Sequence, residues 1–102
     1  MDKINAQIQV QLQDIYRQVI DADQYLEQIR QQGGAKFTEV FATDSVFDTQ
    51  SNRFQPYLQE LTEHYDAWRQ TPADETKLQA VIVRMQLMLS TLATLKQVRQ
   101  AG

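Results

Sequence analysis

The 102-residue chain contains no cysteine, a single histidine, two prolines and three glycines. The absence of cysteine excludes disulfide bonds, cysteine-ligated zinc and thiol nucleophiles, and it fits a reducing compartment. Runs of consecutive apolar residues are also short, because no segment approaches the ~20 such residues that span a bilayer. The N-terminal residues 1–7 lack the charged-then-apolar layout of a signal peptide. We therefore expect a cytoplasmic protein with no membrane association.

A concentrated positive charge is missing as well. The net charge is −3, and residues 1–50 carry eight acidic side chains against four basic ones. Residues 71–102 reverse this balance, with four basic side chains against two acidic ones. A protein that binds duplex DNA on its own usually presents a dense basic stripe that replaces the counterions of the phosphates. The charge distribution therefore argues against direct DNA binding.

The chain is instead rich in apolar residues at helical spacing. In residues 3–32 they recur every three or four positions, close to a heptad pattern. This seam consists of Ile4, Ile8, Leu12, Ile15, Val19, Ala22, Leu26 and Ile29. Gly33 and Gly34 follow, and glycine favours a helix end because it readily adopts the left-handed cap conformation. The pattern predicts one long helix over about residues 3–32.

Two further segments have the same spacing. Residues 52–70 carry the stripe Phe54, Leu58, Leu61, Tyr65 and Trp68, with Ser51 or Asn52 as the expected cap. Thr71 and Pro72 are typical of a helix start, and they predict a third helix over residues 72–100. Its stripe consists of Leu78, Val81, Ile82, Met85, Met88, Leu89, Leu92 and Leu95.

The segment before the second helix is less regular. Residues 36–41 alternate apolar and polar side chains, but an isolated strand would have no partner, so a loop or helical turn is favoured. Thr43, Asp44 and Ser45 are good N-cap residues, which allows a short helix near residues 44–50. Three amphipathic helices with short links predict an all-α antiparallel bundle that forms one domain over residues 1–102.

Side chains suited to catalysis are few. Glu60 and His64 are four residues apart and share a helix face, so they could bind a metal or act as an acid–base pair. The alternative is a surface hydrogen bond or a histidine that simply faces solvent. Metal sites need three or four ligands, which favours the last interpretation. Asp21, Asp23 and Glu27 are expected to form a solvated acidic face. An enzyme for an anionic substrate would need converging cations, and the arginines are scattered. We expect no enzymatic activity and no cofactor.

From Phe41 to about Leu95 the sequence resembles the primosomal replication protein N″ (PriC) family. The residues that carry the resemblance are Phe41, Val46-Phe47, Thr49, Gln55, Leu58, Glu60 and Trp68-Arg69, followed by the apolar run of the third helix. Family members have a similar aromatic-rich opening, a Leu-x-Glu helix and a following apolar helix. The first helix matches the family only in its pattern.

The resemblance implies a helical, non-enzymatic protein that helps to restart stalled replication forks. The family recognises single-strand-binding protein and DNA, and it promotes reloading of the replicative helicase. Its members are longer and have a basic C-terminal half linked to DNA binding, so this chain resembles their N-terminal domain. The resemblance therefore implies a protein partner, either single-strand-binding protein or the replicative helicase.

Two hypotheses of function follow. In the first, an acidic-hydrophobic tail or helix of the partner docks into a groove between helices. Arg53, Arg69 and Arg84 are the candidate basic contacts, and Tyr57 and Trp68 are the candidate apolar anchors. In the second, the chain is a structural coiled-coil-like adaptor, chaperone or oligomerisation domain. It would then bury its Ile4-to-Ile29 seam against another chain, as in a homo-oligomer.

Overall fold

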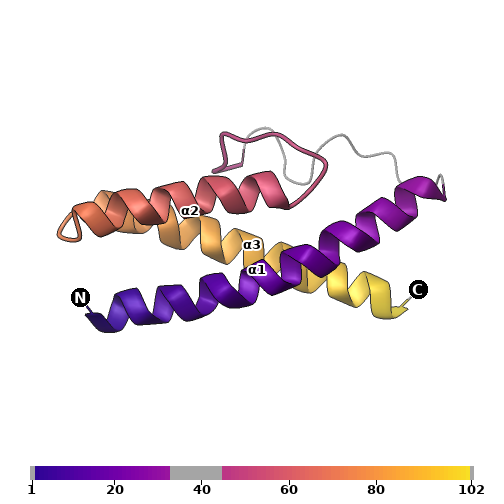
Figure 1. Ribbon diagram of the computed structural model, residues 1–102, viewed down its shortest axis with the longest axis horizontal. Helices are drawn as coiled ribbons and strands as arrows, with labels where there is room; N and C mark the ends of the chain where they lie inside the picture. The colour runs from indigo at the N-terminus through magenta and orange to yellow at the C-terminus, as the bar shows by residue number, and fades with distance from the viewer. Residues whose placement is uncertain (1, 33–44, 102) are drawn as a thin grey trace.

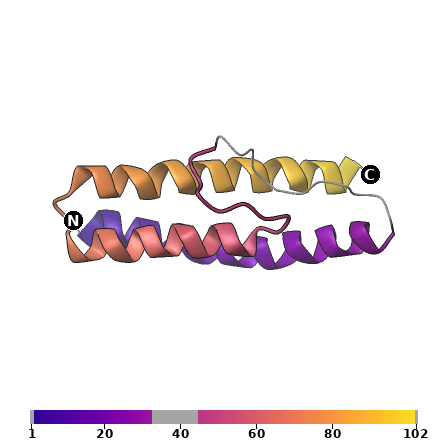
Figure 2. The ribbon, with the colours of Figure 1, turned by 90° about the horizontal axis from the view of Figure 1, so that it is seen from above.

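The computed structural model describes residues 2–32 and 45–101, and it confirms an all-α bundle of three helices. Helix α1 spans Asp2–Gln31, α2 spans Gln55–Gln70 and α3 spans Glu75–Ala101. Helices α1 and α3 run in the same direction and α2 runs opposite to both (Figure 1). Seen from above, α1 and α2 lie together on one side and α3 lies on the other (Figure 2). The described ranges contain no strand.

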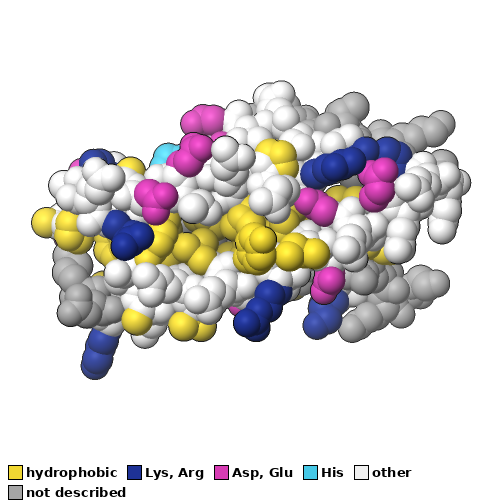
Figure 3. All heavy atoms as spheres, viewed as in Figure 1, with side chains coloured by type: hydrophobic (Ala, Val, Ile, Leu, Met, Phe, Trp, Pro, Cys, Tyr) yellow, Lys and Arg dark blue, Asp and Glu magenta, His cyan; other side chains and the backbone are white. Residues whose placement is uncertain are grey.

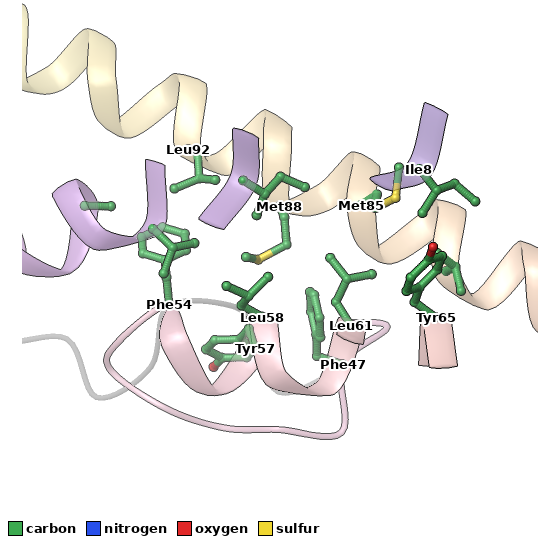
Figure 4. Close-up of a cluster of buried hydrophobic side chains, with 14 of the residues drawn as sticks. Ile8, Phe47, Phe54, Tyr57, Leu58, Leu61, Tyr65, Met85, Met88 and Leu92 are labelled. Atoms are coloured by element: carbon green, nitrogen blue, oxygen red, sulfur yellow. The ribbon is translucent and has the colours of Figure 1, made fainter. Parts of the chain in front are cut away.

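The core lies where the three helices meet. Met88 and Leu92 of α3 point toward Phe54 and Leu58 of α2 (Figure 4). Apolar burial of this kind contributes roughly 25 cal/mol per Å², so the largest enclosed side chains dominate the packing energy. These are Trp68, Tyr57, Phe54, Ile15, Leu61, Met88, Val19 and Val81.

Most of the heptad-like seam of α1 is buried within its own chain, although Ile4 at its start is 40% exposed. Ile8, Ile15, Val19, Ala22 and Leu26 all belong to the core cluster. They pack against α2 and α3, so the seam is not free to pair with another chain in this structure. Any second chain would have to contact a different face of α1.

Helix α2 begins three residues later than the sequence pattern predicts, and its cap comes from another helix. The N-cap residue is Phe54, which has no side-chain cap bond of its own. Asp23 of α1 accepts hydrogen bonds from the backbone N–H of Phe54 at 2.6 Å and of Gln55 at 3.0 Å. Its neighbour Glu27 binds Arg53 at 3.0 Å. The expected solvated acidic face is therefore wrong for Asp23 and Glu27, which hold the start of α2 against α1.

Replacing Asp23 with alanine is expected to lower the free energy of unfolding by about 1 to 2 kcal/mol, as for loss of a helix cap. The backbone donors of Phe54 and Gln55 would lose their acceptor, and a carboxylate would leave the positive end of the α2 dipole. Asp21→Ala is the matched control, because Asp21 is exposed and two residues away. Urea denaturation of both variants measures the difference, and equal effects would contradict the capping role.

The short helix expected near residues 44–50 is absent from the described part of that range, because residues 45–50 form an irregular loop. Phe47 turns inward and packs edge-to-face on Tyr57, with ring centroids 5.1 Å apart. The backbone N–H groups of Asp48 and Thr49 point at the Glu60 carboxylate, so they are not used in helical turns. Asp44 and the alternating segment 36–41 lie outside the described residues, as do Gly33 and Gly34.

Helix α3 also begins later than predicted. Thr71 and Pro72 lie in a turn, in which the Asp74 N–H donates to the Thr71 carbonyl at 2.9 Å. Asp74 acts as the cap, because its carboxylate accepts the N–H of Lys77 at 3.2 Å. The capping chemistry was thus expected in the right turn, but it falls three residues further along the chain.

Helix α3 is apolar around much of its circumference. By length and composition alone, its segment Glu75–Gln97 could cross a membrane, although the chain lacks a long uninterrupted apolar run. A minority of this segment is buried. Core helices meet the same criterion, and Val81, Met85, Met88 and Leu92 lie in the core here.

Candidate partner-binding groove

An open groove of about 480 Å³ lies between α1 and α2. Helix α1 contributes Leu12, Gln13, Tyr16 and Arg17, and α2 contributes Leu58, Thr62, Tyr65 and Asp66. Apolar side chains form a continuous patch along the middle of this face of the molecule (Figure 3). The groove therefore has an apolar floor and a polar rim.

The floor exists because α1 carries apolar residues beside its core seam. Leu58 and Tyr65 are buried, and Leu12 is half-buried and packs against the core. Tyr16 lies one turn beyond Leu12, and 53% of its surface is exposed. An exposed aromatic side chain next to an apolar depression is typical of a protein-binding surface.

Hydrogen bonding holds one end of the groove in place. The Tyr65 hydroxyl donates to the Asn5 side-chain oxygen, which joins the C-terminal half of α2 to the start of α1. The Tyr65 ring is thereby fixed in the groove wall. A wall that is already ordered lowers the entropic cost of binding.

Cations occupy the rim. The Arg69 guanidinium lies 5.5 Å from the centre of the Tyr65 ring and 3.8 Å from the Asp66 carboxylate. Its side chain is about half exposed. On the opposite wall Arg17 is exposed, and within residues 2–32 and 45–101 it forms no ion pair. Arg17 in the α1 wall and Arg69 beside the α2 wall favour a ligand with negative charge.

None of the five candidate binding residues lines this groove, and Arg69 lies beside it, over the ring of the lining residue Tyr65. Arg53 lies at the start of α2, paired with Glu27. Arg84, Tyr57 and Trp68 are buried, with exposed fractions of 8%, 0% and 1%. These three side chains are part of the protein interior and present no contact surface here.

Sequence reasoning missed Leu12, Tyr16 and Arg17 as groove residues. Leu12 was predicted as part of the apolar seam, and Tyr16 and Arg17 were not among the candidate binding residues. The signal was available, because an aromatic residue four positions after a seam residue extends the apolar face sideways. Whether a neighbouring helix covers Tyr16 depends on how the helices pack, and the sequence alone does not specify that packing.

A second cluster surrounds the buried ion pair of Glu60 and Arg84. Arg84 Nε donates to the Glu60 carboxylate at 2.9 Å, and Arg84 Nη2 donates to the Val46 carbonyl at 2.8 Å. Glu60 also accepts the N–H and the hydroxyl of Thr49, both at 2.7 Å, and the N–H of Asp48 at 3.1 Å. The cluster ties the loop before α2 to both α2 and α3.

The charge state of Glu60 follows from these contacts. Burial raises the pKa of its carboxyl, but the hydrogen bonds from Thr49, Arg84 and Asp48 outweigh burial. The pKa is therefore lowered from its ordinary value of 4.5, and the group is a stable carboxylate. A general acid or base at neutral pH would need a raised pKa, so this cluster is structural.

The Glu60 carboxylate points to Arg84 and the loop, and it is not paired with His64 in any contact of the described residues. Both residues border a polar depression next to α2 that also contains Glu63. No group of three or more His, Asp or Glu side chains in the described ranges is arranged to hold a metal ion. The predicted surface hydrogen bond between Glu60 and His64 is therefore wrong, and the other half of that interpretation, a histidine facing solvent, agrees with the partial exposure of His64.

No protein-family model, curated protein or solved structure matches this chain. The resemblance to the primosomal replication protein N″ family thus rests on the sequence motif alone. The geometry of the groove indicates a binding function independently of that motif.

Proposed function

We propose that this chain is a non-enzymatic protein-interaction module whose α1–α2 groove binds an apolar segment of a protein partner. The observation that carries the proposal is an open, mainly apolar groove that has the exposed Tyr16 and Arg17 in its α1 wall and Arg69 next to Tyr65 of its α2 wall. Segments that fit such a groove are amphipathic helices or tails whose apolar side chains enter the depression. The arginines favour acidic residues next to those apolar side chains.

The partner that we propose belongs to the replication-restart machinery. The sequence motif supports this assignment, through its resemblance to the primosomal replication protein N″ family. Single-strand-binding protein, through an acidic-hydrophobic tail, and the replicative helicase are the two partners of that family that involve protein contacts. The low positive charge of this chain favours protein over DNA as its ligand.

Reversing the charge of Arg17 or Arg69 is expected to weaken binding of the single-strand-binding-protein tail about 2- to 5-fold each, because rim charges contribute up to about 1 kcal/mol. Arg30→Glu is the matched control, since Arg30 is an exposed arginine on α1 outside the groove. Isothermal titration calorimetry of the tail peptide against the three variants measures the effect. Titration with the replicative helicase tests the alternative partner.

Different results would contradict different parts of the proposal. Absence of binding by both the tail peptide and the helicase would rule out the replication-restart assignment. Binding that Arg30→Glu weakens as much as Arg17→Glu would place the contact outside the groove.

A further inference from the structure

Helix α1 exposes apolar side chains on a face that residues 2–32 and 45–101 leave uncovered. Tyr16 is 53% exposed and Ile20 is 42% exposed. They are four residues apart, so they stand one turn apart on one face beside the groove. We call Tyr16 and Ile20 the α1 ridge. Val10 is more exposed, at 66%, and it lies on the side of the helix that also carries Arg17 and Asp21.

The ridge is flanked by one positive and one negative side chain. Arg17 and Asp21 are exposed and lie four residues apart along the same edge of the ridge. In the described part of the chain, neither of them forms an ion pair or a hydrogen bond. Arg17 and Asp21 can therefore form ion pairs with a second apolar surface that presents an acidic and a basic side chain in the reverse order.

We infer that the α1 ridge binds a second copy of this chain, with the two α1 helices antiparallel across a twofold axis beside residue 19. In such a symmetric pair the same edge of each helix meets. The axis places Arg17 opposite Asp21 of the second copy, and it places Asp21 opposite Arg17 of that copy. One rotation thus forms two ion pairs from charges that have no partner in the described monomer.

The same axis also matches the apolar side chains. It interleaves Tyr16 and Ile20 of one copy with Ile20 and Tyr16 of the other, about two residues or 3 Å apart along the axis. Gln13 then lies next to Gln24 of the second copy, where their amides can form hydrogen bonds. A heterologous partner would need to reproduce this order of charges, whereas a second copy has it by symmetry.

The dimer would also cover the groove, because Tyr16 belongs both to the ridge and to the groove wall. Two α1–α2 pairs would then face each other as a four-helix arrangement. A bound partner and a second copy would therefore compete, a consequence that rests on the proposed function. The dimer itself does not depend on the identity of any partner.

Sedimentation equilibrium of the full chain without any partner tests the dimer. Ile20→Glu is expected to lower the association constant at least about tenfold, since symmetry introduces the buried charge twice. Gln7→Glu adds the same charge at an exposed position on the opposite side of α1, and it is expected to leave association unchanged. Circular dichroism verifies that both variants remain helical.

A charge exchange tests the register. Arg17→Asp or Asp21→Arg alone is expected to weaken association about 3- to 10-fold, because each creates two like-charge contacts. The double variant Arg17→Asp with Asp21→Arg restores both ion pairs and is expected to recover association. Three results would overturn the inference: a monomer at every concentration, equal weakening by Gln7→Glu and Ile20→Glu, or no recovery in the double variant. None of these measurements involves the proposed partner, so its failure to bind would be seen separately.

Discussion

Replacing Glu60 with alanine is expected to lower the free energy of unfolding by about 3 to 5 kcal/mol, the usual cost of removing one partner of a buried ion pair. The substitution leaves the Arg84 guanidinium buried without its carboxylate. It also removes the acceptor for the N–H groups of Asp48 and Thr49, so the loop before α2 loses its attachment. Urea denaturation followed by circular dichroism measures the loss.

Two variants distinguish this effect from a general loss of charge. Glu63→Ala removes an exposed carboxylate from the same helix and is expected to change stability by less than about 0.5 kcal/mol. The double variant Glu60→Leu with Arg84→Met is expected to lose less free energy of unfolding than either single variant, because no buried charge then remains unpaired. If the losses of the two single variants simply add in the double variant, Glu60 and Arg84 do not stabilise each other as a buried ion pair.

The stability of the wild-type protein is also expected to depend on pH through Glu60. The pKa of this carboxyl is lowered in the folded state, so the unfolded chain binds the proton more readily. Its contribution is fully present above its ordinary pKa of 4.5 and is lost as the pH falls through the lower folded value. The difference in stability between the wild-type protein and Glu60→Ala should therefore shrink below pH 4.5. A difference that is constant down to the acid transition would contradict this account.

Replacing Trp68 with alanine is expected to lower the free energy of unfolding by about 3 to 5 kcal/mol, since Trp68 is 1% exposed and its loss leaves a large cavity. Tyr16→Ala is the control, because it truncates an exposed aromatic residue and should leave the stability of the monomer within about 0.5 kcal/mol. Thermal unfolding followed by circular dichroism compares the two variants. If Trp68→Ala instead left the stability unchanged and abolished partner binding, Trp68 would be a surface anchor and not a core residue.

The positions of the helices could be predicted from the sequence because each has a strong local signal. The seam of α1 and the apolar stripes of α2 and α3 repeat at helical spacing, and most of their residues lie in the core or pack against it. The beginnings of α2 and α3 were less predictable. Asp23 caps α2 from another helix, and this contact between residues 31 positions apart has no local signature.

The sequence predicted the chemical character of the groove but not the residues that form it. An apolar groove with basic residues beside it was expected, but four of the five candidate residues lie elsewhere in the fold. Arginine beside apolar residues has the same appearance in sequence whether it binds a partner or a buried carboxylate. Arg84 illustrates the problem, because its contacts with Glu60 and Val46 depend on a loop whose path the sequence pattern did not indicate.

We propose that a partner binds in the α1–α2 groove, and a nuclear magnetic resonance titration can locate the binding site directly. The isotope-labelled protein is titrated with the single-strand-binding-protein tail peptide, and the amide chemical shifts are followed. Binding in the groove is expected to give the largest shifts on residues 12–17 of α1 and residues 58–69 of α2, and Arg17→Glu is expected to reduce these shifts. Saturable shifts confined to α3 or to the loop at residues 45–51, or no shifts at all, would contradict it.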